Sequence, residues 1–95
     1  MVKGFENIDL DSFFNNQPVL KAYLFGSYAR NQSSPDSDVD FLLEMEDNAN
    51  LFQLISIKLN LEKLFNRTVD IVTTNGISPR LKPYIDKDKI LIYER

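Results

Sequence analysis

The sequence has 95 residues, 43% of them hydrophobic, with a net charge of −3 at pH 7 and neither cysteine nor histidine. This length predicts one domain (residues 1–95), and the absence of cysteine excludes a disulfide framework and thiolate metal sites. The acidic balance argues against stable nucleic-acid binding, which needs clustered lysine and arginine. Without histidine there is no serine–histidine–aspartate triad and no imidazole base, so carboxylates must carry any acid–base or metal chemistry.

The sequence predicts neither a membrane span nor a signal peptide. No run approaches the roughly 18 apolar residues of a span, and Asp9 and Asp11 interrupt the apolar residues near the N-terminus. We therefore expect a cytoplasmic protein without membrane contact. A domain this small hides a modest share of its surface, so we also expect association, as a homo-oligomer or with another protein.

The first half of the chain predicts a short helix and two strands that are separated by a polar loop. Apolar residues predict a helix over residues 8–15, which ends before Pro18, and a strand over residues 19–25. A short helix over residues 27–32 and a run of turn-forming residues follow. Residues 39–45 are almost all apolar, as in a strand from the middle of a sheet.

The second half predicts one long helix between two strands. Asn48 or Asn50 can cap this helix, which runs from about 51 to 65. The β-branched run over residues 68–73 predicts a strand, and a further strand is expected over residues 90–93. Between these strands, a Ser-Pro pair after a glycine can open a helical turn.

Several side chains in this half receive purely structural interpretations. The long helix has apolar residues mostly on one side, and two more widen the stripe; the first group is Leu51, Leu54, Ile55, Leu61, Leu64 and Phe65, and the second is Ile57 and Leu59. Tyr84 and Tyr93 are expected to pack in the interior. The alternating charges near the C-terminus predict a solvated edge that consists of Lys82, Asp86, Lys87, Asp88 and Lys89.

Gly26 and Ser27 end the first strand and suit the binding of phosphate. Gly26 lets the backbone approach a phosphate closely, and Ser27 offers an amide and a hydroxyl at the start of a helix. The alternative is that Ser27 simply caps the helix. Arg30 occupies the position where a capping box has an acid, which puts a positive charge at the positive end of the helix. That placement favours a bound anion such as a triphosphate.

Three aspartates are candidate metal ligands. Asp38 and Asp40 open the second strand with side chains on one face and Cα atoms roughly 6.5–7 Å apart. Such a pair can hold Mg²⁺, and two ions stabilise the attacking and leaving oxygens of an in-line displacement. Asp70 would complete the site for the first ion and could accept the proton of an attacking hydroxyl. The alternatives are an ordinary turn at Asp38 and Asp40, and an exposed strand residue at Asp70.

One sheet topology brings these residues together. Strands 19–25 and 39–45 must run antiparallel, because Gly26 follows the end of the first and Asp40 lies at the start of the second. The long helix then provides a right-handed crossover, after which strand 68–73 runs parallel to strand 39–45. The sequence therefore predicts an α/β (α+β) domain with a mixed three- to four-stranded sheet flanked by helices.

These motifs resemble those of the DNA polymerase beta-like nucleotidyltransferases, and above all of the minimal nucleotidyltransferases that are often paired with HEPN-type toxins. The resemblance covers residues 19–72, and the ending ILIYER is also similar. It is carried by Gly26-Ser27, Ala29-Arg30, Ser37-Asp38-x-Asp40 and Asp70. Family members commonly have glycine after the Ala-Arg pair; here this residue is Asn31, which tolerates a left-handed backbone.

The resemblance implies a Mg²⁺-dependent nucleotidyltransferase that moves a nucleoside monophosphate, expected to be AMP from ATP, to an acceptor hydroxyl. The implied acceptor is a tyrosine of a HEPN-type toxin, for which the chain would act as the antitoxin. Asp38, Asp40 and Asp70 would hold two Mg²⁺ ions, whereas Gly26, Ser27 and Arg30 would contact the nucleotide. Two alternatives stay open: a stoichiometric antitoxin without catalysis, and the catalytic subunit of a small-molecule (antibiotic) nucleotidyltransferase.

Overall fold

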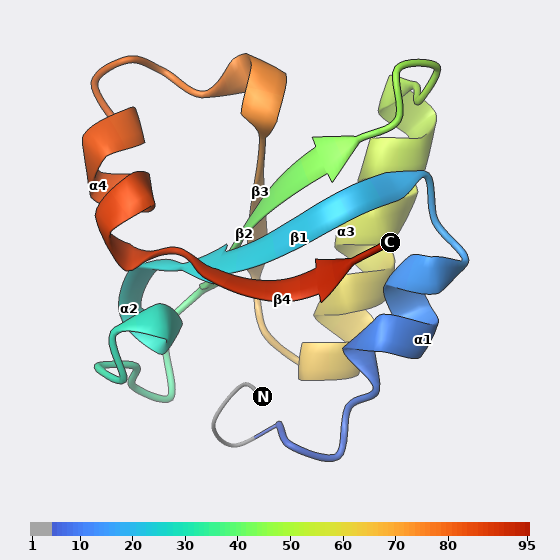
Figure 1. The fold of residues 1–95 in the computed structure, drawn as a ribbon. Helices are drawn as coiled ribbons and strands as arrows, with labels where there is room; N and C mark the ends of the chain where they lie inside the picture. The colour runs from blue at the N-terminus through green and yellow to red at the C-terminus, as the bar shows by residue number, and fades with distance from the viewer. Residues whose placement is uncertain (1–4) are drawn as a thin grey trace.

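The computed structural model describes residues 5–95, in which helices flank a four-stranded sheet (Figure 1). The elements are, in chain order, α1 (Leu10–Asn15), β1 (Val19–Phe25), α2 (Gly26–Ala29), β2 (Val39–Met45), α3 (Leu51–Phe65), β3 (Val69–Thr73), a 3₁₀ turn (Thr74–Gly76), α4 (Lys82–Asp88) and β4 (Ile90–Glu94). Within residues 5–95 no helix combines the length and the apolarity that a membrane crossing requires.

The sheet has the mixed topology that the sequence predicts. Its strand order is β3-β2-β1-β4, with β1 antiparallel to both of its neighbours and β2 parallel to β3. The parallel pair needs a crossover, which α3 provides. Phe25 at the end of β1 faces Asp40 in β2, and Asp40 faces Asp70 in β3. Residues from three strands therefore meet at one edge of the sheet.

The core lies between the sheet and the helices α1 and α3. In β2, Val39, Phe41, Leu42 and Leu43 are all buried, which explains why this central strand is almost continuously apolar. Aromatic rings join the layers: Phe41 contacts Phe14 of α1 and Phe65 of α3, at centroid distances of 6.2 and 5.7 Å. These contacts fix α3, and with it the crossover to β3.

The buried face of α3 differs from the prediction. Ile57, Leu61 and Phe65 are buried, whereas a second set that was expected to share this face is exposed: Leu51, Ile55 and Leu64. Apolar residues occur around most of this helix, so their spacing alone does not select the face that packs. Packing into the core, as in the contact of Phe65 with Phe41 of β2, selects it.

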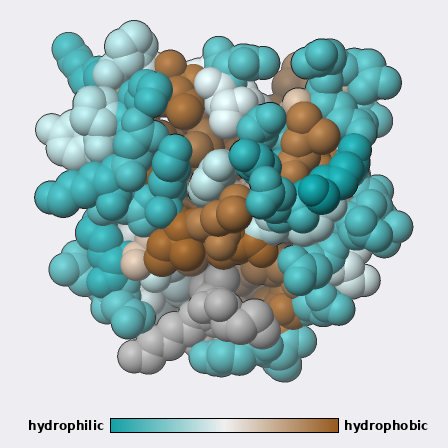
Figure 2. Space-filling model, in the orientation of Figure 1, coloured by the Kyte–Doolittle hydropathy of each residue, from teal (hydrophilic) through white to brown (hydrophobic). Residues whose placement is uncertain are grey.

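Two further expectations need correction. The helix expected over residues 27–32 ends at Ala29, because Asn31 adopts the left-handed conformation (φ 61°) that a helix cannot continue. Tyr93 is buried as expected, but Tyr84 of α4 is 70% exposed. Apolar side chains also gather across the middle of the face on which β4 lies (Figure 2), where Ile90 and Leu91 are both about half exposed.

Candidate active site

Asp40 and Asp70 form the centre of the candidate site. They lie opposite each other in the parallel register of β2 and β3, so their side chains leave the same face of the sheet. Asp40 is half-buried and Asp70 is exposed, and their carboxyl groups are in hydrogen-bonding contact. The crossover through α3 thus brings together two acids that are far apart in the sequence.

The surroundings of Asp40 oppose its ionisation. Burial, followed by the negative charges of Asp70 and Asp38, raises the pKa of Asp40 from its ordinary value of 3.8 to about 6, against an opposing effect of Arg30. Compared with an ordinary aspartate, Asp40 favours its neutral form, because the ionised carboxylate would be partly removed from water and close to other negative charges. A cation bound here would offset that repulsion.

Gly26 brings the backbone against Asp40. Its φ is +76°, and a Cβ built at this position would lie 2.1 Å from the Oδ2 of Asp40. A side chain at residue 26 therefore meets both an unfavourable backbone conformation and a direct clash. The close approach leaves the Gly26 turn and the Asp40 carboxylate side by side, with no side chain between them.

Ser27 and Arg30 occupy positions in α2 that differ from those expected. The helix begins at Gly26 with Phe25 at the N-cap, so Ser27 lies inside the first turn and is half-buried. Arg30 is the C-cap and not a residue of the first turn. The argument from its unfavourable place at the positive helix end is therefore wrong, since a cation at the carboxyl end is favourable.

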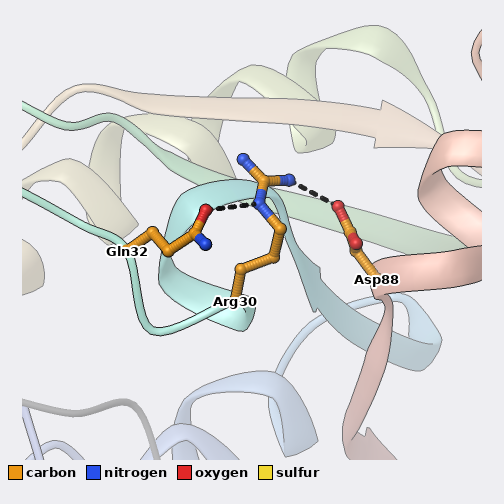
Figure 3. A network of polar contacts seen from close by, with 3 residues as sticks. All are labelled: Arg30, Gln32 and Asp88. Atoms are coloured by element: carbon orange, nitrogen blue, oxygen red, sulfur yellow. Dashed lines mark hydrogen bonds and ion pairs between the residues drawn. The ribbon is translucent and has the colours of Figure 1, made fainter.

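Arg30 is paired with a residue that the sequence did not single out. Its Nη1 donates to the Oδ2 of Asp88 at 2.5 Å, and its Nε donates to Gln32 at 3.2 Å (Figure 3). Asp88 was assigned to a solvated edge, yet its side chain is only 14% exposed. No local pattern could reveal this pair, because its two members are 58 residues apart.

A groove of about 500 Å³ opens beside the paired acids. Asp40 and Asp70 provide its carboxylates, Lys58 provides a cation, and the other lining residues are apolar: Phe25, Leu54, Ile55, Ile71, Val72 and Leu81. A polar floor with apolar walls suits a ligand that presents a reacting oxygen from an otherwise apolar surface.

Asp38 does not line the groove that Asp40 and Asp70 share. It precedes β2 and is exposed, and it lines a separate hollow with Pro35 and Arg67. Its charge nevertheless raises the pKa of Asp40. Within residues 5–95 no three acidic side chains converge closely enough to enclose a metal ion. Asp40 and Asp70 are held by two paired strands, whereas Asp38 lies in the loop before β2.

The donor set fits a hard divalent cation. All three acids offer oxygen ligands, which Mg²⁺ prefers. The pKa of Asp40 is raised first by burial and then by the charges of Asp70 and Asp38, and a bound cation would offset that repulsion. The Asp40 carboxylate lies directly against the Gly26 backbone, where a Cβ would be only 2.1 Å from its Oδ2, so residue 26 adds no side chain that would cover these oxygens. Asp38, Asp40 and Asp70 are the residues that would hold the metal.

Comparisons with known proteins identify the family of this chain. Residues 9–95 match the family model described as "Polymerase beta, Nucleotidyltransferase". "Putative protein adenylyltransferase MJ0435" of Methanocaldococcus jannaschii is 42% identical over 67 residues, which are 70% of this chain and 72% of that protein. "Protein adenylyltransferase MntA" of Thermococcus cleftensis is 29% identical over 78% of this chain and 75% of its own.

Solved structures share the fold. One described as "Structure of putative minimal nucleotidyltransferase" superposes with a TM-score of 0.75 at 33% identity, over 85% of this chain and 83% of that one. A toxin–antitoxin structure with AMP-PNP gives a TM-score of 0.77 at 18% identity, over 90% of this chain and 71% of that one. The resemblance found in the sequence motifs is thereby confirmed: the chain belongs to the polymerase beta nucleotidyltransferase family, within its minimal nucleotidyltransferase branch.

Proposed function

We propose that this chain transfers AMP from Mg²⁺-bound ATP to a tyrosine hydroxyl of a HEPN-type toxin, and that it acts as the antitoxin of that protein. The observation that carries the proposal is the Asp40–Asp70 pair, held in parallel register directly against the Gly26 turn. Carboxylates next to a close-approach glycine are suited to a phosphate that arrives with its metal.

The reaction is an in-line displacement at the α-phosphorus of ATP. The acceptor oxygen forms a bond to this phosphorus, the bond from phosphorus to the bridging oxygen of the β-phosphate breaks, and pyrophosphate leaves. Asp70, which is exposed at the groove, accepts the proton of the acceptor hydroxyl. Gly26 and Ser27 border the phosphates, and Arg30 adds positive charge nearby. Mg²⁺, held by Asp38, Asp40 and Asp70, would neutralise the charge on the phosphates.

The form of the acceptor follows from the groove and from the relatives. The groove is open and mostly apolar beyond its two carboxylates, which suits an aromatic side chain that ends in a hydroxyl. The two relatives described above are among several with protein adenylyltransferase in their names. One solved structure with a similar fold contains a tri-AMPylated HEPN toxin of Shewanella oneidensis with its MNT antitoxin. These findings support a protein acceptor of the HEPN type.

The test is an intact-mass measurement on proteins that co-purify with the tagged chain from its own host, with and without Mg-ATP. We expect a partner that gains whole AMP units, and we expect EDTA to prevent the gain. Asp38→Asn, Asp40→Asn and Asp70→Asn should each abolish labelling while the circular dichroism spectrum stays unchanged. Asp36→Asn is the matched control, since Asp36 is exposed in the same loop.

The same experiment separates the alternatives. Labelling that persists in all three aspartate variants would contradict the assignment of the site. A partner that binds stably, gains no mass and is still neutralised by the Asp38→Asn chain would indicate an antitoxin that acts by binding alone. Transfer to a small hydroxyl compound in the absence of protein would indicate a small-molecule enzyme.

A further inference from the structure

The Arg30 guanidinium is held from two sides. Asp88, at the end of α4, accepts from Nη1 at 2.5 Å, and Gln32, after α2, accepts from Nε at 3.2 Å (Figure 3). The two acceptors belong to separate parts of the chain and restrain different nitrogens of one planar group. A guanidinium restrained in this way has a defined orientation.

The Arg30–Asp88 pair differs from the other ion pairs of α4. Asp86, two residues earlier, pairs with Lys82 and Lys89 of its own segment, and its side chain is 37% exposed. The Asp88 side chain is 14% exposed and its partner lies 58 residues away. Local exposed pairs contribute little to stability, whereas this pair joins two distant segments through a largely covered Asp88, although the Arg30 side chain itself is 45% exposed.

The position of Arg30 gives this pair a connection to the site. Arg30 follows the Gly26 turn by one short helix, and its charge reaches Asp40, whose pKa it lowers. A guanidinium has five N–H donors, and the contacts with Asp88 and Gln32 occupy Nε and Nη1. Donors therefore remain for an anion, and that anion does not have to displace Asp88.

We propose that Asp88, assisted by Gln32, is a positioning residue that holds the Arg30 guanidinium ready for the β- and γ-phosphates of the nucleoside triphosphate. The inference rests on the proposed function, since it needs a triphosphate beside Gly26. An unrestrained arginine loses rotamer freedom when a ligand orders it, and this loss weakens binding. The contact with Asp88 orders the Arg30 side chain already when the protein folds. The loss of rotamer entropy therefore no longer opposes nucleotide binding.

Calorimetric titration of Mg-ATP and of AMP into the full chain tests this role. We expect Asp88→Asn to weaken ATP binding by roughly tenfold, the scale of one ordered long side chain. AMP binding should change much less, because AMP has no β- or γ-phosphate. Asp86→Asn is the matched control on the same helix and should leave both affinities unchanged. Asp88→Glu should restore part of the ATP affinity.

A double variant shows whether Asp88 affects ATP binding through Arg30. In a chain that already carries Arg30→Ala, Asp88→Asn should cause no further loss of ATP affinity, because Asp88 acts through Arg30. An additional loss there, or an equal loss for ATP and AMP together with a lower melting temperature, would overturn the inference in favour of general damage to the fold.

The remaining outcomes are equally decisive. The inference would be overturned if Asp88→Asn bound ATP as tightly as Asp86→Asn does, or more tightly. Tighter binding would mean that Asp88 competes with the phosphates for Arg30. If the unsubstituted chain bound no ATP, the proposed function and this inference would both fail. If the unsubstituted chain bound ATP and Asp88→Asn bound it equally well, only this inference would fail, and the proposed function would stand.

Discussion

At the scale of single residues, Asp40 combines a central role with a poor environment for its charge. Burial, then Asp70 and Asp38, raise its pKa from 3.8 to about 6. Between these two pH values the folded chain binds more protons than the unfolded chain. The Asp40 contribution to the free energy of unfolding therefore falls as the pH rises through this window, and stability is lower above it.

We therefore predict that Asp40→Asn is more stable than the unsubstituted chain at pH 7, by on the order of 1–2 kcal/mol once solvent screening is allowed for. The same variant should have no transferase activity. Urea unfolding at pH 3 and pH 7 measures the effect, which should shrink toward pH 3, where the carboxyl is largely protonated in both the folded and the unfolded chain. An equal difference at both pH values, or one that Asp36→Asn reproduces, would contradict this origin.

The sequence allowed some site residues to be placed and not others. The crossover predicted that Asp70 returns to the edge of the sheet where Asp40 lies, and the structure places the two residues directly opposite each other. The tolerance of Asn31 for a left-handed backbone was also anticipated. Asp88 could not be found, because a contact over 58 residues leaves no local pattern. The roles of Asp38, Asp40 and Asp70 in metal binding and transfer stay predictions that the aspartate variants test.

At the scale of elements, the start of α3 is fixed by a complete capping box. The side chain of Asn50 accepts from the Gln53 backbone N–H at 2.9 Å, and the Gln53 side chain accepts from the Asn50 backbone N–H at 2.9 Å. Both bonds satisfy donors that a helix otherwise leaves free. The sequence left Asn48 and Asn50 as equal candidates, and only the observed backbone distinguishes them.

This cap predicts different outcomes for two similar substitutions. Asn50→Ala should lower the free energy of unfolding by about 1 kcal/mol, the usual cost of a lost N-cap. Asn48→Ala should have almost no effect, since Asn48 is exposed and precedes the cap. Urea midpoints at constant m-value measure both, and equal losses would show that the cap contributes nothing specific.

Element boundaries were predictable where a pattern was strong. The observed bounds of β1, β2 and α3 match the ranges expected from the sequence, because each is a run of apolar residues between clear breaks. The end of α2 was missed, since it depends on one left-handed residue. The packed face of α3 was partly wrong because its apolar residues surround most of the helix, so tertiary contacts decided the face.

At the scale of the whole molecule, the fold leaves an apolar surface on α3 uncovered. This surface consists of Leu51, Phe52, Ile55 and Leu59, of which Phe52 is 82% exposed. Ile55 also lines the groove of Asp40 and Asp70. Exposed apolar residues that adjoin one another favour association between molecules.

We predict that the isolated chain self-associates as its concentration rises, and that Phe52→Ser weakens this association several-fold without lowering the melting temperature. The loss of one large apolar contact accounts for that size. Sedimentation equilibrium measures the effect. Tyr84→Ser is the control, because Tyr84 is also exposed but lies on α4. An equal response of both variants would show that the α3 surface is not the one that associates.

The position of β4 has a consequence for the order in which the protein matures. β4 follows every other element in the chain, yet it pairs with β1, near the start. Pairing of β1 with β2 closes a short loop, whereas pairing of β1 with β4 closes a loop that includes most of the chain, so we expect β4 to join the sheet late in folding. Asp88, just before β4, reaches Arg30 in the same late step. A folding chain can thus bring Asp40 and Asp70 together before its arginine is held in place, and the ability to hold a triphosphate as proposed arrives last.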